Sequence, residues 1–191
     1  MNSIFIIVIV VIVIVLAAVI MTVEYNSLVV LRNRVDNQSA QVDVQLKRRA
    51  ELIPNLIEIV KGYAEFEKST LTNIAQLRSE VINSGNTSEA CAADAKLGRI
   101  CSQVLAIGES YPELKANTNF LKLQEELSET ENKIVMARQF YNDIITKYNT
   151  AVQVFPKSVM AGIFGFKRKE LLEISHSERE PIKLDSNTFQ F

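Results

Sequence analysis

An unbroken apolar block occupies the N-terminal end of the chain. Residues 4–23 are IFIIVIVVIVIVLAAVIMTV, and Thr22 is the only one of them that is not apolar. A helix of about 20 apolar residues crosses the ~30 Å hydrocarbon core of a bilayer, so the block predicts a transmembrane anchor. A cleaved signal peptide would have a basic start, a shorter apolar core and small residues after that core. Here Met1-Asn2-Ser3 has no charged side chain and Ala17-Ala18 lies inside the block, which favours an uncleaved anchor.

The next stretch has the period of an amphipathic helix, with apolar residues three or four positions apart. Between Tyr25 and Ala50 these residues are Leu28, Leu31, Val35, Val42 and Leu46, with one gap at Ser39. Neither glycine nor proline separates this stretch from the apolar block, so it is predicted to continue the membrane helix as a stalk. Pro54 follows. Since proline lacks the amide donor and clashes with the preceding turn, it either kinks this helix or starts a new one.

Two further helices are predicted between Pro54 and Gly108. Helical spacing resumes after the proline and stops at Ser84-Gly85-Asn86. A shorter helix is predicted over 88–107, with Asn86 and Glu89 as its candidate cap. Gly108 is expected to end it.

The last predicted helix has the most regular period in the chain. Ser110-Tyr-Pro-Glu113 has the pattern of a capping box with proline in the first turn. The apolar positions that follow are Phe120, Leu123, Leu127, Thr130, Ile134, Ala137, Tyr141, Ile144 and Tyr148. This alternation of three and four is typical of a bundle or coiled-coil seam, in a helix of about 40 residues. Pro156 is expected to end it.

Composition supports an all-α fold. The chain has 191 residues but only 6 glycines and 4 prolines, too few for turn-rich β folds. The predicted architecture is an antiparallel helical bundle of three to four long helices with an N-terminal transmembrane helix. The count is four if Pro54 divides the first helix and three if it only kinks it. The predicted units are an anchor over 1–24, a bundle domain over 25–156, and a C-terminal amphipathic segment and tail over 157–191.

Charges and cysteines indicate where the bundle lies. No Lys or Arg precedes the apolar block, whereas Arg32, Arg34 and Lys47-Arg48-Arg49 follow it. Basic residues favour the cytoplasmic side, so the bundle is predicted in the cytoplasm and the short N-terminus outside. A formal net charge of −1 gives no bulk basic signal for nucleic acid. Cys91 and Cys101 stand too far apart along one predicted helix for a disulfide, and are expected as small buried side chains in a reducing compartment.

A second apolar segment follows the bundle. Residues 158–169 are SVMAGIFGFKRK. One interpretation is an interfacial element that presses its two nearby aromatic rings into lipid while its basic end meets anionic headgroups. The alternative is that the rings pack on the end of the bundle and the basic side chains are solvated. The candidate membrane-interface residues are Arg32, Arg34, Phe164, Phe166, Lys167, Arg168 and Lys169. The polar residues 170–191 are expected to form a poorly ordered tail.

Motifs that carry chemistry are missing from the sequence. It contains no phosphate-binding loop, nucleophile elbow or zinc-protease motif. His176, the single histidine, stands in one Glu-x-x-His pattern, whereas a di-iron bundle needs two such patterns and two further carboxylates. We therefore predict no catalytic residue, metal, cofactor or small-molecule substrate.

Three sets of polar residues nevertheless have two interpretations each. The glutamates Glu125, Glu126, Glu129 and Glu131 are most simply a solvated helix face, and a general acid/base pair would need a cleft. Lys47-Arg48-Arg49 is surface charge or pairs with these glutamates, with phosphate or with lipid headgroups. Asn55, Glu58, Asn132, Arg138 and Asn142 lie near the seams and are candidates for a buried network that fixes helix register.

Several blocks of the sequence resemble the LemA family. They are YNSLVVLRNRV (25–35), QVDVQLKRR (41–49), LIPNLI (52–57), VKGYA (60–64), YPELKAN (111–117), NFLKLQEEL (119–127), TENKI (130–134), Ala137-Arg138, FYND (140–143) and IFGF (163–166). The resemblance implies a bacterial single-pass protein of the inner membrane with a helical bundle inside the cell, and no established molecular activity. It further implies that some relatives act in magnetosome membrane formation and that some genes lie beside a membrane metalloprotease.

The leading functional hypothesis is a non-enzymatic, membrane-anchored scaffold. Its expected partners are the lipid bilayer and either a second copy or another membrane protein, with a role in membrane organisation or remodelling. The alternative is an adaptor or accessory factor for a membrane-bound protease or an envelope stress system.

Overall fold

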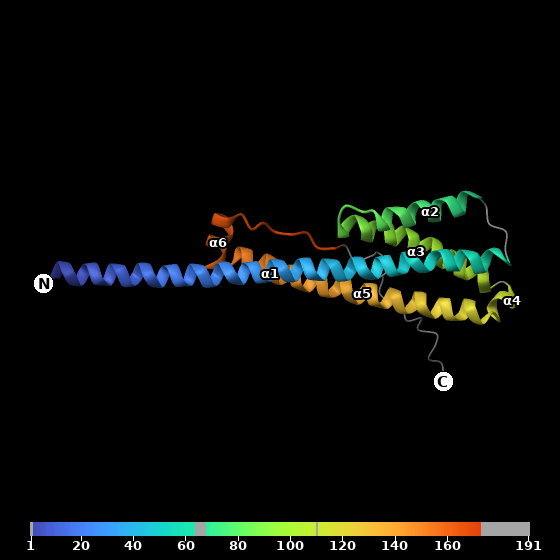
Figure 1. Ribbon diagram of the computed structural model, residues 1–191, viewed down its shortest axis with the longest axis horizontal. Coiled ribbons are helices and arrows are strands. Elements are labelled where there is room, and N and C mark those ends of the chain that lie inside the picture. Colours follow the sequence, from blue (N-terminus) through green and yellow to red (C-terminus); the bar gives the residue numbers. More distant parts are fainter. Residues whose placement is uncertain (1, 64–67, 110, 173–191) are drawn as a thin grey trace, which may run out of the picture.

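The computed structural model describes residues 2–63, 68–109 and 111–172, and all regular structure in these ranges is helical. The helices are α1 (Asn2–Lys61), α2 (Lys68–Ile82), α3 (Thr87–Glu109), α4 (Pro112–Lys115), α5 (Thr118–Gln153) and α6 (Lys157–Phe164). The second half of α1 lies antiparallel to α5, while α2 and α3 pack together beside the far end of α1 (Figure 1). The prediction of an all-α bundle with a long apolar helix at its N-terminus is confirmed.

One helix forms both the predicted anchor and a wall of the bundle. α1 has 60 residues, which gives a length of about 90 Å. Side chains of residues 4–23 are exposed almost throughout, and an unburied window of this helix has a mean hydropathy of 3.8. That part is long and apolar enough to cross a membrane. Because no break separates it from the amphipathic part, the direction of the span also sets the direction of the bundle.

Pro54 lies inside α1, so of the two alternatives that the sequence left open, division of the first helix at Pro54 does not occur. Proline leaves the carbonyl four residues earlier without its helical donor. Here that carbonyl belongs to Ala50, and the Arg78 side chain of α2 donates to it from Nε at 2.9 Å. α1 instead ends at Lys61. The fourth long helix of the bundle is α2, which begins after that end. A neighbouring helix thus satisfies the group that proline frees.

Replacing Arg78 with leucine is expected to lower the free energy of unfolding by about 1–3 kcal/mol, because it leaves a buried carbonyl unsatisfied. In a Pro54→Ala background the new amide bonds to that carbonyl, so the same replacement is expected to cost about 1 kcal/mol less. Denaturant unfolding of the detergent-solubilised full chain, followed by circular dichroism, measures both values. An equal loss in the two backgrounds would show that Arg78 does not compensate for the proline.

The main core lies between the second half of α1, α2, α3 and α5. It contains Val42 and Leu46 of the predicted stalk, and its α5 members Phe120, Leu123, Leu127, Ile134 and Ala137 belong to the predicted seam. Toward its C-terminus α5 departs from that seam: Ile144 is only partly buried, whereas Ile145 and Asn149 are buried. The reason is that α6 and the segment after it cover a second side of α5 there, forming a smaller core with Leu28, Val35 and Tyr148.

The gap in the stalk pattern marks a polar contact with the start of α3. Ser39 Oγ lies 2.5 Å from Thr87 Oγ1, and the Thr87 hydroxyl donates to Asp43 at 3.2 Å. The predicted cap of α3 is confirmed, because the Asn86 side chain accepts from the Glu89 amide at 2.9 Å. Glu89 accepts from Gly85 N, one residue earlier than a capping box requires. The polar residue in the apolar stripe therefore belongs to a specific helix start.

The connection between α3 and α5 differs from the predicted one. α3 continues through Gly108, and a Cβ there would lie 2.4 Å from the Phe120 ring, so the glycine allows a close approach rather than ending the helix. Ser110 lies outside the described residues, and Tyr111 at the start of α4 makes no side-chain cap. Asn117 caps α5 instead, accepting from two backbone amides. α5 accordingly begins later than the sequence pattern suggested.

Two asparagines of α5 hold the extended chain that follows α6. Asn149 bonds to both backbone groups of Lys169, at 2.8 and 2.9 Å, and Asn142 bonds likewise to Leu172, at 3.0 and 2.9 Å. Seven helical residues span about 10.5 Å and three extended residues about 10 Å, so the two spacings match. The described part of the C-terminal segment therefore packs along the bundle, and Leu172 reaches the main core.

Candidate functional site

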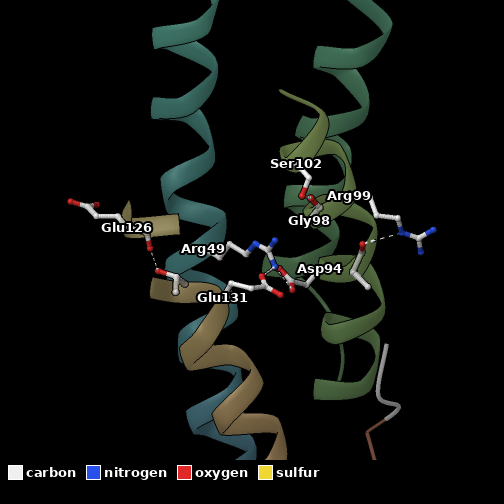
Figure 2. Close-up of polar contacts among 9 residues, drawn as sticks. Arg49, Asp94, Gly98, Arg99, Ser102, Glu126 and Glu131 are labelled. Carbon is white, nitrogen blue, oxygen red and sulfur yellow. Dashed lines mark hydrogen bonds and ion pairs between the residues drawn. The ribbon is translucent and has the colours of Figure 1, made fainter. Parts of the chain in front are cut away.

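A buried ion cluster joins three helices in the middle of the bundle (Figure 2). Arg49 of α1 contacts Asp94 of α3 at 3.0 Å and Glu131 of α5 at 2.5 Å, both through Nη1. The side chains of Arg49 and Asp94 are 11% and 7% exposed, whereas that of Glu131 is 47% exposed. The cluster thus has a buried pair and one carboxylate that reaches the surface.

The position of Arg49 explains why it is buried. It lies seven residues after Val42 and seven before Leu56, so the heptad that faces α5 places it in the core. Gly98 of α3 makes room for the guanidinium, because a Cβ there would lie 2.5 Å from Arg49 Nη2. The pattern of α1 and the small residue on α3 together admit a charge between the helices.

The electrostatics of the cluster are those of a costly buried charge. Burial raises the pKa of Asp94 to about 6, although Arg49 opposes this shift; the nearby Glu131 adds to it. Asp94 Oδ1 has no hydrogen-bond partner among the described residues. Desolvation of a buried ion pair often exceeds its Coulombic gain, so the presence of this pair is weak evidence for added stability.

The sequence interpretations of these polar residues are only partly correct. Pairing of the Lys47–Arg49 run with the glutamates is confirmed for Arg49 and Glu131, while Glu129 pairs with Lys133 on its own helix. The proposed buried network is wrong, since its members are exposed or half-buried and Asn142 binds the C-terminal segment. Asp94 was missed, because one aspartate in a weakly periodic helix gives no signal for burial.

The carboxylates of the cluster are engaged in ion pairs among the described residues. Both carboxylates of the cluster contact the same guanidinium, and the two cavities described below lie elsewhere. No group of three or more metal-binding side chains occurs in the described ranges, and His176 lies outside them. Cys91 and Cys101 are free thiols on α3, and burial raises the pKa of each to about 11, which makes them poor nucleophiles.

The membrane-interface candidates gather where the exposed part of α1 enters the bundle. Lys169 pairs with Asp36 at 2.6 Å, and the Arg32 guanidinium lies 5.3 Å from the centre of the Phe166 ring. Phe166 is buried, so it packs on the bundle rather than facing outward. The exposed candidates are Arg32, Arg34, Phe164, Lys167 and Arg168. Sequence reasoning missed the exposed apolar residues Phe155, Val159 and Ile163, whose outward direction depends on how α6 docks.

Two surface cavities lie away from the ion cluster. One of about 550 Å³ lies between α1 and α2 and is lined mainly by apolar residues, including Ile53, Ile57, Leu71 and Ile74. The other, of about 410 Å³, is more polar and lies beside the turn from α2 to α3. Neither contains the ion cluster.

Comparison with known proteins identifies the family. The model of the LemA family matches residues 38–185, well over half of the sequence. The chain belongs to the LemA family. It is 22% identical over 188 residues to "Magnetosome protein MamQ 2" of Paramagnetospirillum magneticum, an alignment that covers 85% of this chain and 69% of the relative. It is 26% identical over 155 residues to "Protein LemA" of Metamycoplasma hominis, covering 81% and 71%. A "Magnetosome protein MamQ" of Magnetospirillum gryphiswaldense is 22% identical over 188 residues, with 85% and 69% covered.

Proposed function

We propose that this protein is a non-enzymatic scaffold that a single transmembrane helix anchors in the inner membrane. The observation that carries the proposal is the continuity of α1, whose exposed apolar block could cross a bilayer while the rest of the helix packs in the bundle core. The bundle part of α1, from Glu24 to Lys61, extends about 55 Å from the span. Such a rigid link suits a protein that presents binding surfaces at a fixed distance from a membrane. The named relatives include magnetosome proteins, which supports a role in membrane organisation.

The proposed orientation places the bundle in the cytoplasm. Arg32 and Arg34 are exposed on α1 just beyond the apolar block 4–23, Arg48 is exposed further along, and residues 1–3 carry no basic side chain. Basic residues that flank a span favour the cytoplasmic side. The short N-terminus then lies outside.

The scaffold is proposed to bind a second copy or another membrane protein through the outer face of α5. Met136 and Phe140 are 53% and 57% exposed there and, being four residues apart, lie side by side on the helix. A photo-crosslinking amino acid at Phe140 is expected to give discrete crosslinked species in native membranes. The matched control is the same group at the exposed Lys122, which is expected to give far less. Uncrosslinked monomer at both positions would contradict a scaffold that uses this face.

An adaptor for a membrane-bound protease is the alternative, and the groove between α1 and α2 favours it. Its apolar lining is bordered by Glu58, Lys61 and Arg78, a combination that suits an apolar peptide segment with charged flanks. Glutamate at Leu71 is then expected to slow the turnover of a protease substrate as much as deletion of the gene does. The scaffold instead predicts normal turnover in both strains with altered membrane organisation in the deletion strain.

A further inference from the structure

The contacts of α6 place it beside the end of the apolar block of α1. Lys157, the first residue of α6, pairs with Glu24 at 3.7 Å. Phe164, the last residue, packs against Tyr25 with the two rings tilted and their centres 4.6 Å apart. Both ends of α6 therefore contact the same turn of α1, and Figure 1 shows α6 set across the long axis of that helix. Glu24 directly follows the apolar block 4–23, so α6 lies level with the end of the block.

α6 has apolar residues on both of its sides. Met160 and Ala161 face inward and belong to the core with Leu28. On the opposite side Val159 and Ile163 are 46% and 65% exposed. A short helix at the surface of a soluble protein normally turns a polar side outward, so an apolar outer side indicates a partner that is not water.

Residues at both ends of the helix extend this apolar surface. Phe155, just before α6, is 78% exposed, and Phe164 is 57% exposed despite its contact with Tyr25. Gly165 then reverses the chain with a left-handed φ of 72°, which returns it to the bundle at Phe166. The exposed apolar surface of α6 thus ends at Phe164, which contacts Tyr25.

We propose that α6 is an interfacial helix that inserts the side chains of Phe155, Val159, Ile163 and Phe164 into the bilayer surface beside the span. We refer to these four residues as the α6 lipid face. The proposal rests on the membrane anchoring of the proposed function and adds a second membrane contact. A span alone leaves the bundle free to rotate about its axis, whereas a lateral helix fixed to α1 determines which side of the bundle faces the membrane.

Lys169, one of the basic residues after α6, lies further along α1 from the end of the apolar block. Lys169 pairs with Asp36, which lies about 18 Å along α1 from Glu24. The headgroup layer beyond the hydrocarbon core is only about 5–8 Å thick, so Lys169 does not reach it. The proposed contact of α6 with lipid is therefore made by its apolar side chains and not by Lys169.

Tryptophan fluorescence tests the proposal, because the chain contains no tryptophan and each variant carries a single reporter. The full chain with Ile163→Trp is reconstituted into phosphatidylcholine vesicles whose acyl chains are brominated near the headgroup. Contact with these lipids quenches the reporter, so Ile163→Trp is expected to lose most of its emission. The matched control is Leu121→Trp, which replaces an exposed apolar residue near the start of α5, at the end of the bundle far from α6 (Figure 1), and is expected to lose almost none.

Further variants separate the possible outcomes. Ile14→Trp, in the middle of the apolar block, reports on anchoring alone and is expected to be quenched by lipids brominated deep in the chain. Quenching of Ile14→Trp without quenching of Ile163→Trp would overturn the α6 lipid face and leave the anchor intact. If lipid quenches neither Ile14→Trp nor Ile163→Trp, both the membrane anchor and the α6 lipid face are overturned. Shielding of Ile163→Trp from brominated lipid and from aqueous iodide alike would show that protein covers α6, which also overturns the proposal.

The integrity of each variant is checked with Cys101, which is 4% exposed in the bundle core. A variant counts only if this thiol remains protected from alkylation in vesicles. Phe155→Trp provides a second reporter in the α6 lipid face that leaves the packing of α6 untouched, and it is expected to be quenched as Ile163→Trp is.

Discussion

Replacing Arg49 with methionine is expected to lower the free energy of unfolding by about 3–5 kcal/mol at neutral pH. The replacement leaves Asp94 buried without the guanidinium that pairs with it, while the weaker attraction of Arg138 remains. Removing one partner of a buried pair is costly, because the other charge keeps its desolvation penalty without the compensating attraction. Denaturant unfolding of the detergent-solubilised full chain, together with the alkylation rate of Cys101, provides the measurement.

Three controls separate charge from packing. Arg48→Met removes the neighbouring exposed arginine and is expected to change stability by less than about 0.5 kcal/mol. The double variant Arg49→Met, Asp94→Leu removes both charges and is expected to recover most of the loss. Gly98→Ala displaces the guanidinium in the natural chain and destabilises it, but in the Arg49→Met background the same change improves helix propensity and is expected to stabilise. A double variant as unstable as Arg49→Met would refute the role of the unpaired carboxylate.

The stability of the chain relative to an Asp94→Asn variant is expected to fall as pH rises from about 4 to above 6. Burial raises the folded-state pKa of Asp94 from 3.8 to about 6. Between these two values the folded state holds a proton that the unfolded state has released, so stability decreases with pH. A shift of about 2 pKa units corresponds to roughly 3 kcal/mol. Above pH 6 Asp94 is charged in both states and the difference becomes constant.

Comparison with the asparagine variant isolates this single titration. The other carboxylates titrate in both chains and cancel in the difference between the two unfolding free energies. Unfolding is therefore measured for both chains over the same pH series. If the natural chain instead gains stability relative to Asp94→Asn as pH rises, attraction to Arg49 outweighs desolvation. The folded-state pKa of Asp94 would then be lowered, which contradicts the prediction.

Local pattern was sufficient for most of the helical elements. The apolar block, the three-four spacing of the stalk and the regular period of α5 each depend on residues a few positions apart, and each appears as a helix in the structure. The Asn86 cap of α3 has the same origin, because a cap involves only one turn of chain. The effect of Pro54 was left undecided by the sequence, since the donor that replaces its amide is Arg78 on another helix.

The sequence by itself therefore determined the secondary structure, the amphipathic faces and the candidate anchor, because these follow from hydrophobic period and turn chemistry. The tertiary structure decided which polar groups are buried and which apolar groups are left exposed. Arg49 and Asp94 are 45 residues apart and come together only where α1 and α3 pack. The exposure of Val159 and Ile163 likewise depends on which side of α6 contacts α1. Which distant segment meets a given side chain depends on helix packing, and local spacing does not encode that.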